Sequence, residues 1–359
     1  MTTLAEPLHL THGPTWRNRL ALAPLTNIQS HLDGRLGDDE LRWLVARAEG
    51  GFGLTMTCAA YVARAGNPWP GQLGVADDSH LPGLQRLAEA IRAAGSVSSV
   101  QLHHGGIRAS SEVSGEPLVA PWDDEAKGAR ALTTAEVRQA VDDFVAAAVR
   151  SEEAGFDGVQ VHGAHGYLVA QFLDARKNHR TDEYGGDLAG RSRFLFEVLR
   201  GIRESTGSDF QVGLRLSPER FGITVPEAVE LTGEVLASGL VDHLDLSLWD
   251  VRKPVHGGES SDDLLIDHFT ALPRHGVRVG VAGKILAAAD ATWCLEHGAD
   301  FATIGTGAIL HHDFAARAVA DPTFESLPQP VTRAHLEAER VGPAFVEYLA
   351  SGWDDFVSA

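Results

Sequence analysis

The strongest constraint on the fold is an alternation that runs along the chain. Eight times, a short apolar run is followed by a longer stretch with the spacing of an amphipathic helix. This alternation is typical of βα units, whose parallel strands are buried on both faces. The expected strands are Leu20–Ala23, Leu54–Cys58, Val97–Leu102, Gly158–His162, Val212–Leu216, His243–Ser247, Val277–Val281 and Phe301–Ile304. The expected helices are Asp38–Glu49, Leu84–Ala94, Thr134–Ala154, Arg191–Glu204, Val225–Ser238, Leu264–Arg274, Ala287–His297 and Ala315–Ala320.

Eight consecutive units predict an α/β fold of the (β/α)8 barrel type. The competing doubly wound sheet usually binds a dinucleotide through a G-x-G-x-x-G turn after its first strand, whereas Pro24-Leu25-Thr26 follows the first strand here. Thr133 followed by Glu136 has the pattern of a capping box. Three glycines stand where a helix needs a left-handed terminating residue: Gly155, Gly239 and Gly298.

Two connections are too long to be simple links, namely 103–133 after the third strand and 164–190 after the fourth. Both follow strand carboxyl ends, where barrels carry their active sites, so we expect them to be functional. No linker interrupts the pattern, and residues 1–359 are expected to form one domain. The tail 331–359 carries Trp353 and Phe356, and we expect it to cover its own barrel in preference to docking on a partner subunit.

Composition narrows the class of function. The formal net charge of −19 disfavours nucleic acid and anionic membranes as partners. Two cysteines, Cys58 and Cys294, are too few for a cysteine-ligated iron–sulfur cluster. The first ten residues lack the pattern of a signal peptide, and no apolar run reaches the length of a membrane helix. We therefore expect a cytoplasmic protein that acts on a small molecule, and the sequence leaves homo-oligomerisation open.

The segment His162-Gly163-Ala164-His165-Gly166-Tyr167 carries the strongest chemical signal, because it lies at the end of the fourth strand. Two imidazole N–H groups can hold an oxygen on which negative charge develops, and a phenol can deliver a proton. This combination outlines enolate chemistry. A zinc site is an alternative that requires a further ligand, and loop histidines without a role are another.

This segment also carries a family resemblance. Together with Gln171–Leu173, Asn178–Gly186 and Arg191, it resembles the old yellow enzyme family of FMN-dependent ene-reductases. The resemblance extends over nearly the whole chain, through residues 18–26, Val100–Leu102, Val212–Pro218 and Ala299–Gly305.

The resemblance implies a role for each matching residue. Tyr167 would protonate the α-carbon of the substrate, and His162 and His165 would bind its carbonyl oxygen. Gln101 and Arg215 would contact the polar edge of the flavin. The remaining flavin contacts would come from Pro24, Leu25, Thr26, Ala59 and His162.

The FMN phosphate would bind after the seventh and eighth strands, at Gly283-Lys284 and Gly305-Thr306. Here the chain departs from the family, which usually has an arginine where Thr306 stands, and we expect Lys284 to compensate. In the family run Gln-Leu-x-His-x-Gly-Arg, this chain has Ile107 in place of the final arginine, and Arg108 follows one residue further on. Position 28 is Ile, where one branch of the family has tyrosine, and Thr26 replaces a frequent cysteine.

The predicted function is the reduction of activated C=C bonds, such as those of enones, maleimides and nitroalkenes. NADH or NADPH would reduce the flavin and leave before the alkene binds. A dehydrogenase, oxidase or isomerase on the same fold is the first alternative, and a flavin-free phosphate-ligand barrel is the second. A flavin barrel that acts on tRNA is disfavoured by the acidic charge.

Overall fold

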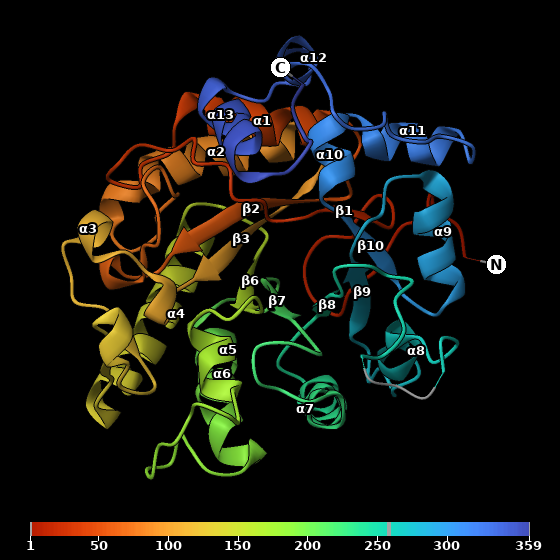
Figure 1. Cartoon of the computed structure of the whole chain (residues 1–359). Helices are drawn as coiled ribbons and strands as arrows, with labels where there is room; N and C mark the ends of the chain where they lie inside the picture. The colour runs from red at the N-terminus through yellow and green to blue at the C-terminus, as the bar shows by residue number, and fades with distance from the viewer. Residues whose placement is uncertain (1, 257–259, 359) are drawn as a thin grey trace.

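A computed structural model describes residues 2–256 and 260–358, so Met1 and Ala359, the ends of the expected domain, lie outside it. Within these residues, eight parallel strands close into a barrel in the order β1-β10-β9-β8-β7-β6-β3-β2 (Figure 1). The strands are β1 Leu20–Leu22, β2 Leu54–Tyr61, β3 Val97–His103, β6 Gly158–Gly163, β7 Gln211–Leu216, β8 His243–Ser247, β9 Arg278–Ala282 and β10 Phe301–Ile304. The predicted (β/α)8 barrel is confirmed.

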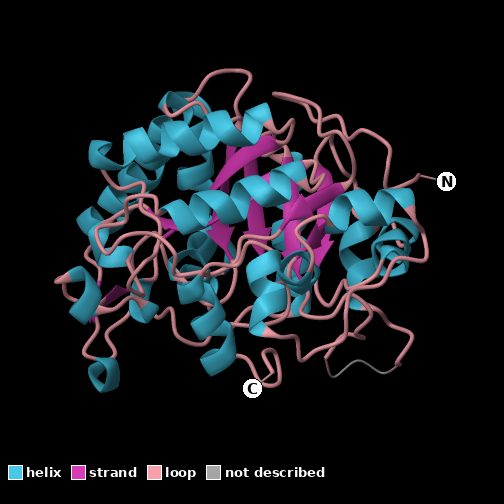
Figure 2. Cartoon of the chain, turned by 90° about the horizontal axis from the view of Figure 1, so that it is seen from above, coloured by secondary structure: helices cyan, strands magenta, loops and turns pink. Residues whose placement is uncertain are grey.

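Helices surround the strands, as the view from above shows (Figure 2). The outer helices are α1 Asp38–Glu49, α2 Leu81–Ala93, α4 Thr134–Glu153, α6 Leu188–Ser205, α7 Val225–Ala237, α8 Leu265–Thr270, α9 Ala288–Glu296 and α11 Phe314–Ala320. Further short helices are α3 Ser111–Ser114, α5 Leu168–Leu173, α10 Thr306–Leu310, α12 Arg333–Ala338 and α13 Pro343–Gly352. Single turns of 3₁₀ helix lie at Arg64–Gly66, Asp78–His80, Gly106–Arg108 and Glu125–Lys127, and the short strands β4 Val119–Ala120 and β5 Arg130–Ala131 pair outside the barrel.

Helix boundaries follow local chemistry. Thr133 and Glu136 form the expected capping box, and Gly155, Gly239 and Gly298 all have positive φ. The helix expected to end at Arg274 ends at Thr270 instead, because Pro273 cannot continue it. The helix expected from Leu84 begins at Leu81, where Pro82 occupies a first-turn position that proline tolerates.

The amino-terminal segment closes the bottom of the barrel. Trp16 is fully buried there, and its ring lies edge-on to Phe301 at 5.0 Å and to His243 at 5.3 Å. Its indole Nε1–H donates to Gln211 Oε1 over 3.1 Å. This plug leaves the carboxyl ends of the strands as the open end of the barrel.

The carboxyl-terminal segment packs on the barrel beside α1, where Figure 1 places α12 and α13. Phe345 is buried with its ring 5.1 Å from that of Trp43. Val331 pairs with Val357, which closes the segment on itself. No helix in the described part of the chain has the length and apolar character that a bilayer crossing demands.

Candidate active site

The carboxyl ends of the strands open into a cavity of about 580 Å³. This is the end of a barrel at which active sites are found. Nine of the predicted site residues line it: Pro24, Leu25, His165, Tyr167, Arg215, Gly283, Lys284, Gly305 and Thr306.

The other four predicted residues do not line this cavity. The His162 ring lies 5.1 Å from that of His165 and 5.2 Å from that of Tyr167, so it belongs to the same cluster. Gln101 is buried on β3, and Ala59 is its register partner on β2. Thr26 lies half-buried beyond β1.

A tight turn after β6 brings the histidines and the tyrosine together. His165 has a φ of 60° and Gly166 a φ of 73°, so the chain reverses and Tyr167 becomes the N-cap of α5. A side chain at Gly166 would meet the Phe221 ring at 2.7 Å, which explains the glycine. The backbone N–H of His165 donates to Ser217 Oγ over 3.1 Å, and its Nε2 lies 2.8 Å from Ser247 Oγ. These contacts fix the His165 ring at the cavity wall.

The surroundings of the cluster fix its protonation. Burial lowers the pKa of His162 well below its ordinary value, and burial with nearby Arg215 and Arg108 lowers that of His165 to about 3. Burial raises the pKa of the Tyr167 phenol. At neutral pH the site therefore presents neutral imidazoles and a protonated phenol.

A third histidine of the cluster, His103, is not among the predicted site residues. It ends β3, is fully buried, and its ring lies 4.3 Å from that of Tyr167 and 5.4 Å from that of His162. Neither of its ring nitrogens has a hydrogen-bond partner in the described residues. Its position two residues after Gln101 on the same strand is the signal that would have found it, because side chains two apart face the same way.

The prediction also lacked the two residues that hold Gln101 and Arg215, namely Gln160 and Asp245. Gln101 donates from Nε2 to Gln160 Oε1 over 2.8 Å, and the two glutamines are register partners on β3 and β6. Arg215 Nε lies 3.1 Å from Asp245 Oδ2 on the neighbouring strand β8, an ion pair that lacks hydrogen-bond geometry. Both new residues occupy strand positions level with predicted ones, so register gives the signal.

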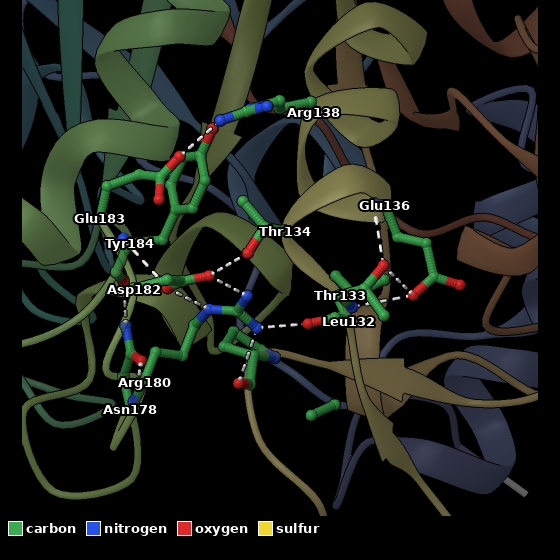
Figure 3. Close-up of polar contacts among 12 residues, drawn as sticks. Leu132, Thr133, Thr134, Glu136, Arg138, Asn178, Arg180, Asp182, Glu183 and Tyr184 are labelled. Atoms are coloured by element: carbon green, nitrogen blue, oxygen red, sulfur yellow. Dashed lines mark hydrogen bonds and ion pairs between the residues drawn. The ribbon is translucent and has the colours of Figure 1, made fainter.

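The two long loops are joined at Arg180 (Figure 3). Its guanidinium donates to Leu132 O over 2.5 Å and to Pro121 O over 3.3 Å, and it forms an ion pair with Asp182. Thr134 Oγ1 also donates to Asp182 over 2.6 Å. The loop that carries Tyr167 is thus tied to the loop that follows β3.

The zinc alternative has no ligand set at this cluster. In the part of the chain that the structure describes, the groups spaced to hold a metal ion are His311, His335 and Glu339, and His312, Asp313 and Glu339. Neither group includes His162 or His165.

Comparison with known proteins identifies the family. The model of the NADH:flavin oxidoreductase / NADH oxidase family matches residues 3–319. The chain belongs to this family. Its members bind FMN and use NADH or NADPH, so the predicted cofactors are confirmed.

Individual relatives agree with this assignment. The chain is 37% identical over 313 residues to a probable NADH-dependent flavin oxidoreductase of Bacillus subtilis, covering 84% of each chain. It is 33% identical to an NADH:fumarate oxidoreductase of Klebsiella pneumoniae, matching 93% of this chain but only 39% of that longer protein. The structure of an old yellow enzyme homologue from Zymomonas mobilis superposes with a TM-score of 0.79 at 26% identity, covering 93% of this chain and 96% of that one. The resemblance to old yellow enzymes is confirmed.

The residues at the mouth of this flavin oxidoreductase fit FMN. Buried polar atoms without a partner among the described residues gather at the strand ends: both ring nitrogens of His103, Nδ1 of His162, Nε of Arg215 and both carboxylate oxygens of Asp245. Leaving such a group unsatisfied costs about 1–3 kcal/mol, so a polar ligand is expected beside them. The isoalloxazine edge, with its carbonyl and ring nitrogen atoms, supplies matching groups.

The turns after β9 and β10 carry the residues predicted to bind the FMN phosphate. A side chain at Gly283 would meet the backbone N of Asp250 at 2.7 Å, and Lys284 is held in a left-handed conformation with a φ of 51°. Lys284 Nζ lies 3.1 Å from Asp250 Oδ2, and its side chain is 71% exposed. Gly305 and Thr306 begin the short helix α10 at the same wall.

Proposed function

We propose that this flavin oxidoreductase reduces activated C=C bonds, such as those of α,β-unsaturated carbonyl compounds, with NADH or NADPH. The observation that carries the proposal is a cluster at the cavity wall: His165 and Tyr167 line the cavity, and the buried His162 ring lies behind them, 5.1 Å from the His165 ring and 5.2 Å from the Tyr167 ring. Bound FMN supplies a hydride that it receives from the nicotinamide.

In this proposal the two histidines hold the carbonyl oxygen of the substrate. Their lowered pKa values keep them neutral, so each offers an N–H donor to an oxygen that gains negative charge when hydride reaches the β-carbon. Ser247 Oγ can donate to His165 Nε2, which leaves the Nδ1–H of that ring as the donor. Such donors stabilise the transition state more than the ground state because the charge appears only there.

Tyr167 then protonates the α-carbon. Its raised pKa keeps the phenol protonated until a strongly basic enolate carbon is present, and the half-buried Tyr167 side chain then regains a proton from solvent.

The cofactor contacts are assigned as follows. Gln101, held by Gln160, and Arg215, held by Asp245, meet the polar edge of the flavin. Lys284 meets the phosphate together with backbone N–H groups of Gly283, Gly305 and Thr306. The walls of the flavin site come from Pro24, Leu25, Thr26 and Ala59.

The visible spectrum of the purified protein tests the proposal. A flavin band that is bleached by anaerobic NADH or NADPH and restored by cyclohexenone is the expected result. A band that is bleached but not restored by any activated alkene would overturn ene-reduction and favour the specialised dehydrogenase, oxidase or isomerase. A protein that neither holds nor takes up FMN would contradict the assigned contacts.

Tyr167→Phe tests the proton donor. The variant removes the acidic hydrogen and keeps the ring contacts with His103, so we expect reoxidation by the alkene to slow by roughly 10²–10⁴-fold. Reduction by NADPH should be unchanged, because the phenol takes no part in it. Stopped-flow measurement of the two half-reactions separates them, and equal slowing of both would argue against this role.

A further inference from the structure

The cavity at the barrel mouth is cationic, although the chain as a whole carries a net charge of −19. Its lining contains Arg108, Arg215, Arg220 and Lys284, and no aspartate or glutamate among the described residues lines it. A strongly acidic surface around a basic cavity focuses the attraction for an anion on the cavity itself.

Two of these cations are already neutralised by carboxylates. Arg215 pairs with Asp245 and Lys284 pairs with Asp250, each at 3.1 Å. Arg108 and Arg220 form no ion pair with any residue from 2–256 or 260–358. Their charges are therefore available to a ligand.

Aromatic rings hold both guanidinium groups without neutralising them. The Arg108 guanidinium carbon lies 4.7 Å from the centre of the Tyr167 ring, and the group also donates to the backbone O of His165. The Arg220 guanidinium carbon lies 4.4 Å from the centre of the Trp249 ring. Stacking on an aromatic face orients an arginine and leaves its donors free for a bidentate partner.

Both arginines line the same cavity as His165 and Tyr167 of the proposed catalytic cluster. Arg108 contacts the His165 backbone and the Tyr167 ring directly, whereas Arg220 is linked to His165 through the Trp249 ring, which lies 6.4 Å from the His165 ring. An anion bound by these arginines would therefore share the cavity with His165 and Tyr167.

We propose that Arg108 and Arg220 bind a carboxylate carried by the substrate, so that this enzyme selects activated alkenes with an anionic group over neutral ones. This inference rests on the proposed ene-reduction and names its substrate class. Guanidinium groups suit this task because they bind a carboxylate through two parallel N–H···O bonds.

A matched pair of substrates tests the proposal. N-(2-carboxyethyl)maleimide and N-propylmaleimide share the reacting ring and differ in a remote carboxylate. Each partly exposed ion pair should contribute up to about fivefold, so we expect the reduced enzyme to prefer the carboxylate by about 5–25-fold in kcat/KM. The preference should shrink at high ionic strength, because the charges are solvent-accessible. Equal rates for the two maleimides would overturn the inference.

Variants locate the preference. Arg108→Gln and Arg220→Gln should each lower the ratio of the two kcat/KM values by up to about fivefold. The ratio corrects for any effect of Arg108 on the Tyr167 ring that both substrates share. Arg252→Gln is the control, because this substitution removes the same unit of charge outside the cavity lining. Arg252 pairs with Asp290 and lies over the Trp293 ring. An equal loss in the control would show that net charge, rather than these arginines, sets the preference.

Two further measurements separate the remaining outcomes. If the variants weaken binding of NADH or NADPH and leave the ratio unchanged, the arginines serve the phosphates of the reductant and the inference is wrong. If neither maleimide reoxidises the flavin, the proposed ene-reduction fails. In that case the saturated N-(2-carboxyethyl)succinimide and N-propylsuccinimide still test the anion site by their spectral titration of the oxidised holoenzyme. Tighter binding of the carboxylate that is lost in both variants would support the site, and equal binding would overturn it.

Discussion

Single residues decide the charge state of this barrel. Burial disfavours a positive charge on His162 and His165, and nearby Arg215 and Arg108 disfavour it further. Neutral rings can donate without repelling the nearby cations. The site thus concentrates fixed positive charge on arginines, and leaves hydrogen bonding to the histidines.

The phosphate assignment depends on Lys284 and its partner. Asp250 lies 3.1 Å from Lys284 Nζ and competes with a phosphate for the same charge. The family usually has an arginine at the position of Thr306. If Lys284 takes over its role, Lys284→Ala should raise the Kd for FMN by about fivefold, as expected for an exposed ion pair. Asp250→Asn should lower this Kd, since it releases the lysine. Titration of the apoenzyme with FMN, followed by flavin fluorescence, measures both, and an unchanged Kd in Lys284→Ala would refute the compensation.

His243 should make the folded state sensitive to acid. Burial lowers its pKa to about 4, against an ordinary value near 6.5 in the unfolded chain. Between these values the unfolded chain binds a proton that the folded chain excludes, so stability is retained above about pH 6.5 and falls towards pH 4 by about 1.4 kcal/mol per pH unit.

His243→Gln removes this titration, so the slope of unfolding free energy against pH should fall by about that amount between pH 6.5 and pH 4. Urea unfolding at several pH values measures it. His31→Gln is the matched control, because the side chain of His31 is exposed. An unchanged slope in His243→Gln would mean that His243 is not kept neutral by burial.

At the scale of elements, the sequence predicted most strands and helices to within a few residues, because apolar periodicity and caps are local signals. It missed the ends of β2 and β3, which extend to Tyr61 and His103. The register between these strands shifts between Met56 and Ala59, and such an irregularity depends on the partner strand. The structure within the two long loops could not be predicted either, because it depends on contacts between the loops, such as those of Arg180.

Arg180→Met should loosen both long loops. The change leaves Asp182 without its ion pair and two carbonyl groups without a donor, and we expect a loss of about 2–3 kcal/mol. This is below the usual cost for a fully buried pair, because the Asp182 side chain is 22% exposed. Urea unfolding gives the loss, and limited proteolysis should show faster cleavage between residues 121 and 132.

Arg138→Met is the control for this loop contact. Arg138 pairs with Glu183 in the same network, but its side chain is 67% exposed, so little change in stability is expected. Equal losses in the two variants would show that the buried contacts of Arg180 have no special role in joining the loops.

At the scale of the whole molecule, the carboxyl-terminal segment links the barrel wall to the cavity. The motif residues of the mouth were predictable because strand ends place them there, whereas the contribution of Tyr348 and Trp353 to the cavity lining was not. Their positions depend on how α13 packs against α1, and on Gly342 N–H donating to Gln29 Oε1 over 2.9 Å in the loop after β1. Such long-range contacts leave no periodic signal in the sequence.

Phe345→Ala tests whether this segment completes the substrate site. Removing a buried aromatic ring that packs against Trp43 should cost about 3–5 kcal/mol and lower the Tm. Because α13 carries Tyr348 and the segment ends beyond Trp353, its loosening should also raise the KM for the alkene, with the flavin absorbance of the folded enzyme unchanged. Val319→Ala, a change at an exposed position on α11, is the control and should alter neither quantity. Assays well below the lowered Tm separate the two effects. A lower Tm with an unchanged KM would mean that the segment stabilises the barrel without shaping the site.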